Sequence, residues 1–390
     1  MGVVSGVDRT QRRFSVFGFP LAVIYKFFDD QGNYLAAAIS YYAFIAIFPL
    51  LLLASSIFGF ILQGNPELQD QVLNSALRQF PIVGEQLGRP KGLQGSTGAV
   101  VLGATAALYG ALGLGQAIQN LMATAWAIPR NSRPNPFLLR LKSLLLLFFA
   151  GLAVIGVSVF SALGSNTEVF GAGINTTIKL AIWAGTVVVV GLVLTFLMRF
   201  AAAGRLRYRQ ALPGGFTVAV LWQGLQWLGT YYATNVLTGP TSLNQTFGFV
   251  LGLIGIIYIA AVMAVLGVEV NVVRTRRLWP RALLTPFTDS VDLTEADRRA
   301  YAMYAQMQRH KGFETVTVRF DGRDGGTHEI VLDPGAREPT LQGASVAVPD
   351  PADRPRDDVR PTAPRAFDPP PPPPPPTAPF AVRPDDRAPH

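Results

Sequence analysis

Residues 247–273, FGFVLGLIGIIYIAAVMAVLGVEVNVV, decide the fold class of this protein. The stretch carries a single charged side chain, Glu269, and Arg274, Arg276 and Arg277 follow it closely. About 20 mainly apolar residues are enough for a helix to cross a hydrocarbon core roughly 30 Å thick. The stretch therefore predicts a membrane-spanning helix that ends in a basic cluster.

Five further stretches have the same character: residues 34–62, 97–125, 144–163, 178–198 and 215–237. The chain has 390 residues, of which 49% are hydrophobic and only 15% are charged. A soluble domain is about a quarter charged. We therefore expect an all-α membrane protein, a bundle of six transmembrane helices. Small residues at four-residue spacing, which end at Gly115 on one span and include Gly248 and Gly252 on the last, predict close helix packing.

Basic residues mark every second connection between these stretches, and the intervening connections are balanced or uncharged. The four basic clusters are Arg9, Arg12, Arg13 and Lys26; Arg130, Arg133, Arg140 and Lys142; Arg199, Arg205, Arg207 and Arg209; and Arg274, Arg276, Arg277 and Arg281. Positively charged loops stay in the cytoplasm, so both termini are predicted to be cytoplasmic. The clusters either only set this topology or also bind anionic lipid headgroups.

The expected organisation has four parts. Residues 1–33 form an N-terminal cytoplasmic segment with an interfacial helix, and residues 34–281 form the six-helix transmembrane domain. Residues 282–335 form a small cytoplasmic helix followed by a hairpin, and residues 336–390 form a disordered cytoplasmic tail rich in proline. The proline run 369–376 predicts polyproline II, which serves either as a solvated spacer or as a docking motif for a partner protein.

The apolar residues 14–28 follow basic residues, as in a secretory signal, but Lys26 interrupts them and no small-residue cleavage site follows. We predict an interfacial helix here, with its aromatic residues at headgroup depth and its basic residues facing anionic lipid. Those aromatic residues are Phe14, Phe17, Tyr25, Phe27 and Phe28.

Two short elements are predicted beyond the last span. Thr294, with Asp297 three residues later, is typical of a capped helix start, and that helix is expected to run through Gln308. Apolar residues then alternate with polar ones over residues 314–320 and again at Ile330 and Leu332, which favours a hairpin.

The residue types exclude several kinds of site. The chain has no cysteine, and its histidines, His310, His328 and His390, all lie outside the apolar stretches. We therefore predict no metal, no cofactor and no catalytic residues in the membrane, because a metal site or a nucleophile–base pair needs clustered side chains. The net charge is +8, but the basic residues lie beside the apolar stretches, so a nucleic-acid partner is not expected.

A polar pocket is predicted near the cytoplasmic end of the bundle. A charged side chain inside a span costs roughly 2.5 to 3.5 kcal/mol at the helix centre, so Glu269 needs a reason to be there. The predicted pocket comprises Ser40, Tyr41, Gln116, Gln119, Asn120, Glu269 and Asn271, with Gln223 and Gln226 as an extension. The alternative is that these residues only form hydrogen bonds between helices.

These residues also carry a resemblance. The matching segments are residues 37–42 leading to Phe48, Pro49 and Leu50; residues 113–126 with Gln119, Asn120 and Trp126; Pro213 and Gly214; and Gly267, Glu269 and Asn271. Together they resemble the YihY/BrkB family of bacterial envelope proteins over residues 9–281. The resemblance implies a six-helix protein of the bacterial inner membrane with cytoplasmic ends, linked to envelope integrity and, in some members, to lipid or small-molecule export.

Three functions remain open on this basis. The first is transport or handling of a lipid or small molecule, with Glu269 binding a headgroup or a proton. The second is a non-catalytic scaffold whose polar residues only hold helices together. The third, an intramembrane enzyme or a nuclease, is disfavoured because the spans lack a nucleophile–base pair and a cluster of metal ligands, and Glu269 stands almost alone in them.

Overall fold

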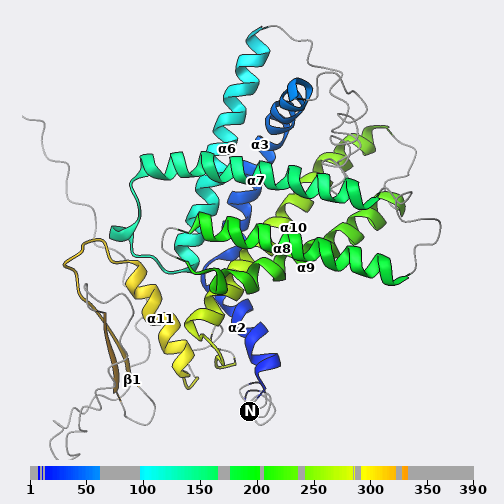
Figure 1. Cartoon of the computed structure of the whole chain (residues 1–390). Helices are drawn as coiled ribbons and strands as arrows, with labels where there is room; N and C mark the ends of the chain where they lie inside the picture. The colour runs from blue at the N-terminus through cyan, green and yellow to red at the C-terminus, as the bar shows by residue number, and fades with distance from the viewer. Residues whose placement is uncertain are drawn as a thin grey trace, which may run out of the picture. The chain divides into compact units, whose positions relative to one another are not determined.

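The computed structural model of the chain describes residues 8, 11, 14–61, 97–165, 176–202, 206–235, 242–283, 285, 291–321 and 327–332 (Figure 1). All of them belong to one compact unit, Met1–Ser345. The proline-rich tail and the whole connection between the first two predicted spans lie outside the described residues. The predictions made for those segments therefore stay predictions.

Six long helices make up most of the described chain. They are α3 (Gly32–Ile61), α6 (Thr97–Ala125), α7 (Pro136–Ser165), α8 (Thr176–Ala201), α9 (Tyr208–Asn235) and α10 (Ser242–Arg276). Each of the six predicted spans coincides with one of these helices to within a few residues, apart from an earlier start of α7 and α9. The chain is thus mostly helical, as its composition predicts.

Two of these helices contain described stretches long and apolar enough to cross a membrane: Trp183–Ala201 on α8 and Val250–Arg276 on α10. Only 28% and 22% of their most apolar windows are buried inside the protein. The core helix of a soluble protein would be mostly buried, so these exposed apolar faces favour contact with lipid. The number of crossings and the side on which the termini lie stay predictions.

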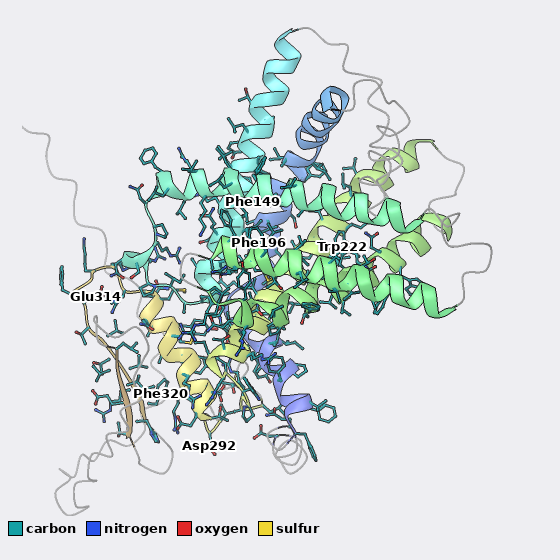
Figure 2. The ribbon with its side chains drawn as sticks, in the orientation of Figure 1. Phe149, Phe196, Trp222, Asp292, Glu314 and Phe320 are labelled. Atoms are coloured by element: carbon teal, nitrogen blue, oxygen red, sulfur yellow. The ribbon has the colours of Figure 1, made fainter. Side chains whose placement is uncertain are left out.

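Neighbouring helices pack in the order of the sequence. α3 packs on α6, α6 on α7, α7 on α8, α8 on α9 and α9 on α10, and α10 packs back on α3. Phe149 of α7 and Phe196 of α8 meet edge to face, with ring centroids 5.6 Å apart (Figure 2). The six helices therefore form a closed ring of neighbours, in which the last long helix packs against the first.

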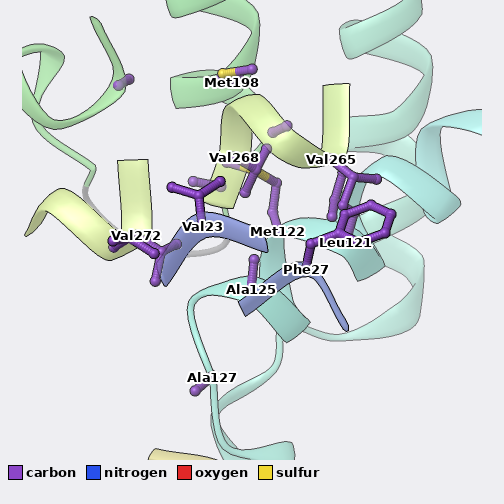
Figure 3. Packing of buried hydrophobic residues seen from close by; sticks show 14 of the residues in the cluster. Val23, Phe27, Leu121, Met122, Ala125, Ala127, Met198, Val265, Val268 and Val272 are labelled. Atoms are coloured by element: carbon purple, nitrogen blue, oxygen red, sulfur yellow. The ribbon is translucent and has the colours of Figure 1, made fainter. Parts of the chain in front are cut away.

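The N-terminal helix α2 (Ser15–Asp29) packs against α10 and α3. Figure 3 shows Val23 and Phe27 of α2 among Leu121 of α6 and Val265 and Val268 of α10, all in one buried apolar cluster. Phe14, Phe17 and Phe28 are exposed, whereas Tyr25 and Phe27 are buried inside the protein. Lys26 is only 1% exposed, so the prediction that it faces anionic lipid is wrong. A charged partner in the bundle holds it inside instead.

The capped helix and the hairpin are confirmed. Helix α11 (Glu295–Met307) begins with a capping box in which Thr294 and Asp297 exchange side-chain and backbone hydrogen bonds. Strands β1 (Val316–Asp321) and β2 (Thr327–Leu332) pair antiparallel, and Ala302 of α11 packs against Ile330 and Leu332.

The turn between α11 and β1 is held by Glu314, which accepts hydrogen bonds from the backbone N–H groups of His310 and Lys311 at 2.8 and 3.1 Å (Figure 2). These bonds lower the pKa of Glu314, because they favour its charged form. The carboxylate therefore stays ionised and keeps the turn closed at neutral pH.

Candidate functional site

Glu269 of α10 is fully buried, and a charged side chain from another helix reaches it. The Nζ atom of Lys26 on α2 lies 3.6 Å from Glu269 Oε2. The same Nζ donates a hydrogen bond to Asp30, the C-cap residue that directly follows α2, one turn after Lys26. Lys26, Asp30 and Glu269 are each at most 5% exposed. We call these three residues the buried ionic cluster.

The sequence explains how Asp30 is placed beside Lys26. Helix α2 stops after Asp29, and Gln31 adopts a positive φ of 55° that turns the chain directly into α3. The next residue is Gly32, where a Cβ would overlap the Phe27 ring. A side chain at this position would have to displace the Phe27 ring, so glycine favours the close return of the chain that places Asp30 against the end of α2.

The buried ionic cluster has two carboxylates for one ammonium group. Among the described residues, neither oxygen of Glu269 and only one oxygen of Asp30 has a hydrogen-bond partner. Breaking a buried ion pair, which leaves one charge without a partner, costs roughly 3 to 5 kcal/mol. An excess negative charge in this cluster is therefore unfavourable. The arrangement is therefore suited to accepting one further positive charge, either a proton or a cationic group.

Tyr304 of α11 covers this cluster. Its ring lies 5.1 Å from Lys26 Nζ, and its buried hydroxyl has no hydrogen-bond partner among the described residues. Burial and the nearby carboxylates of Asp30, Asp29 and Glu269 raise the pKa of Tyr304 well above its ordinary value. Tyr304 therefore stays neutral at physiological pH and shields the cluster without adding charge.

A second buried ion-pair network lies next to the first. Arg281 Nη1 donates to Asp29 Oδ2 at 2.6 Å, and Arg281 Nε donates to Asp297 Oδ1 at 2.7 Å. Burial opposes the charge of Arg281, but the two carboxylates outweigh it and raise its pKa. Since Asp29 ends α2 and Asp297 lies in the first turn of α11, Arg281 joins both helices to the segment that follows α10. Asp297 also accepts the backbone N–H of Ala282 at 2.9 Å.

Two of the predicted pocket residues tie neighbouring helices together. Gln119 of α6 donates to Ser143 Oγ of α7 at 2.8 Å and to the Leu139 carbonyl at 3.1 Å. Asn271 of α10 accepts the backbone N–H of Gly214 on α9 at 2.7 Å. Both side chains are buried, and their described partners belong to other helices.

The remaining predicted residues have separate surroundings. Ser40 is buried and donates to the Ala36 carbonyl of its own helix at 2.8 Å, whereas Tyr41 is exposed and packs against Tyr42. Gln116 is exposed, and Asn120 is exposed and accepts a hydrogen bond from Arg133. Gln223 and Gln226 are partly buried on α9. Among the described residues, no hydrogen bond joins two of the seven main pocket residues, and their role in binding stays a prediction.

Sequence reasoning missed the partners of Glu269. The local pattern predicts that Lys26 lies at the membrane surface, and it does not point to Asp30 or Tyr304 as partners of Glu269. One signal was available: Lys26 interrupts an otherwise apolar stretch, and a lysine on the apolar face of a helix needs an anionic partner. The described residues contain no group of three or more His, Asp or Glu side chains that could hold a metal ion.

Comparisons with known proteins identify the family of this chain. The chain is 22% identical over 277 residues to the inner membrane protein YhjD of Escherichia coli (strain K12), an alignment that covers 66% of this chain and 81% of that protein. No solved structure matches the chain. The family described as Virulence factor BrkB matches residues 23–286, a segment that contains Lys26, Asp30, Glu269 and Arg281. Since this segment is more than half of the sequence, the chain belongs to the BrkB family.

Proposed function

We propose that this protein crosses the bacterial inner membrane six times, with both termini in the cytoplasm, and supports envelope integrity by transporting or handling a lipid or small molecule. The relative named an inner membrane protein and the two exposed apolar helices support the location. The observation that carries the transport role is the buried ionic cluster, in which Glu269 lies in an apolar helix and shares one lysine with Asp30. The proposal assigns no enzymatic activity and no cofactor.

In the proposed mechanism, Glu269 exchanges partners. Lys26 balances the cluster when no other cation is present. A proton or a cationic group on Glu269 weakens its attraction for Lys26, because the Coulomb energy between them is lost. Since Lys26 lies on α2 and Glu269 on α10, occupancy of Glu269 then controls how tightly α2 holds α10. Asp30 and Tyr304 face the same site, and Arg281 holds Asp29 beside it.

Replacing Glu269 by glutamine tests this proposal, because glutamine keeps the size of the side chain and removes its charge. The variant is expressed in a strain that lacks the native protein, and envelope permeability to a dye is measured. We expect Glu269→Gln to lose complementation while the purified protein still elutes as a single folded species. Glu329→Gln, at an exposed position on β2, is the matched control and should complement fully. Full complementation by Glu269→Gln would refute the transport role.

A scaffold function is the second candidate, and the interhelical bonds of Gln119 and Asn271 favour it. Such bonds contribute about 0.6 to 2 kcal/mol each in membranes. If the protein is only a scaffold, complementation by a series of variants at Gln119, Asn271 and Glu269 will follow their thermal stability in detergent. A Glu269→Gln protein that is stable yet inactive separates the transporter from the scaffold.

A further inference from the structure

A shallow groove of ≈ 410 Å³ lies where α9 begins and α10 ends. Arg209, Leu212, Pro213 and Phe216 of α9 line it, together with Arg274 of α10. No residue of the buried ionic cluster lines the groove. It is therefore a separate feature from the site assigned to transport.

The four lining residues of α9 share one face of that helix. Their spacing of three, four and seven residues after Arg209 brings them onto a single stripe. Arg209 stands at the helix end, and Leu212 and Phe216 follow about one and two turns further in. Arg274 lies in the last turn of α10, which packs along α9. The groove thus has two cations at its mouth and an apolar wall that runs toward the middle of the helices.

Both arginines are available to a ligand. Their side chains are exposed, and among the residues that the structure describes neither has an ion-pair or hydrogen-bond partner. No carboxylate lines the groove. By contrast, the nearby Arg199 is engaged, because its guanidinium stacks on the Tyr208 ring at 4.0 Å and donates to the Leu206 carbonyl.

We infer that this groove binds an anionic phospholipid, with its phosphate between Arg209 and Arg274 and an acyl chain along Leu212, Pro213 and Phe216. Arginine pairs strongly with phosphate oxygens, and basic pockets between membrane helices suit lipid headgroups. A free phosphate ion would leave the apolar wall without a partner, whereas a phospholipid satisfies both parts of the groove. This inference does not rest on the proposed transport function.

The test uses the full-length protein purified in a neutral detergent. Phosphatidylglycerol is titrated in, and bound lipid is counted by native mass spectrometry. We expect Arg209→Gln with Arg274→Gln to weaken binding about 25-fold, because each arginine near a lipid phosphate contributes roughly a factor of five. Arg130→Gln with Arg140→Gln removes the same charge from two exposed positions outside the groove and should bind like wild type.

Two further variants, a lipid without net charge and a phosphate competition test the inference further. Arg209→Lys with Arg274→Lys keeps both charges and should retain most of the affinity. If the double glutamine variant cannot be purified, the single variant Arg274→Gln replaces it, and its affinity should fall about fivefold. Equal losses of affinity in the two double glutamine variants would overturn the inference. Binding of phosphatidylcholine to the wild-type protein as tightly as phosphatidylglycerol would overturn it as well. Displacement of the lipid by millimolar inorganic phosphate would also overturn it, in favour of a simple phosphate site.

Discussion

At the scale of single residues, Arg281 forms two ion pairs that join separate helices. It is fully buried between Asp29 and Asp297, and glutamine at this position leaves two carboxylates without their cation. Removing one partner of a buried pair costs roughly 3 to 5 kcal/mol. We expect Arg281→Gln to lower the midpoint of thermal unfolding in detergent strongly.

Arg298→Gln is the control for this prediction. Arg298 pairs with Glu295 three residues earlier on the surface of α11, and exposed pairs of this kind are worth about 0.2 to 1 kcal/mol. The control should therefore unfold within a few degrees of wild type. Equal unfolding temperatures for the two variants would show that the Arg281 network carries no structural load.

Tyr304 gives a prediction about alkaline pH. Its pKa is raised in the folded protein, whereas an unfolded tyrosine loses its proton at about pH 10. Ionisation above that pH therefore favours unfolding, and the stability present below it is lost as pH rises toward the folded pKa. Tyr304→Phe removes this effect, so its unfolding temperature should fall less than that of wild type between about pH 7 and about pH 11.

Tyr34→Phe serves as the comparison, because the ring of Tyr34 is 68% exposed. It should follow wild type across the same pH range. The hydroxyl of Tyr304 has no hydrogen-bond partner among the described residues, so its removal should cost little at neutral pH. A large loss for Tyr304→Phe at neutral pH would contradict the described surroundings of the ring.

At the scale of helices, the contact between α9 and α10 depends on a glycine. A Cβ on Gly214 would overlap the Gly267 carbonyl oxygen and the Asn271 amide, so alanine forces the two helices apart. We expect Gly214→Ala to reduce the yield of folded protein, measured by fluorescence-detected size-exclusion chromatography of a fusion. Forcing extra atoms into a packed contact typically costs about 1 to 3 kcal/mol.

Gly224→Ala is the matched control on the same helix. A Cβ there meets nothing within 4 Å, and alanine favours the helical state by about 1 kcal/mol over glycine. This variant should fold at least as well as wild type. Equal yields for the two variants would mean that α9 and α10 do not approach as closely as described.

The sequence predicted the helices better than their contacts. Long apolar runs fix where a helix forms, because length and hydrophobicity act locally, and the Thr294–Asp297 cap was equally local. Packing depends on which face meets which. Gly115 packs as predicted, since a Cβ there would lie 2.5 Å from Ser143, but a Cβ on Gly252 meets nothing within 4 Å. A four-residue spacing of small residues marks a smooth stripe without naming its partner.

For the candidate site, the sequence identified Glu269 but not its surroundings. A carboxylate in an apolar run stands out by cost alone. Its partners Lys26 and Asp30 come from the far end of the chain, and nothing in the local pattern of residues 14–30 shows which helix they contact. The long-range pairing of α2 with α10 could be read only from the structure.

At the scale of the whole molecule, the absence of cysteine gives a direct test of topology. Single cysteines can be introduced without a background and labelled on intact cells with a membrane-impermeant maleimide. We expect Ser242→Cys, at the start of α10, to be labelled from outside and Asn131→Cys, between α6 and α7, to be protected until the cells are opened. Labelling of Asn131→Cys on intact cells would contradict the proposed orientation and indicate the opposite one.

The ion pair between Arg281 and Asp29 joins residues 252 positions apart, which has a consequence for biosynthesis. A ribosome that adds about 5 to 20 residues per second completes Arg281 on the order of tens of seconds after Asp29 has emerged. During that interval the nascent N-terminal helix has neither Glu269 nor Arg281 to hold it. The N-terminal helix of the newly made chain can therefore dock only when translation has passed the last apolar helix. A stalled or shortened product leaves the N-terminal helix undocked and accessible to quality-control proteases.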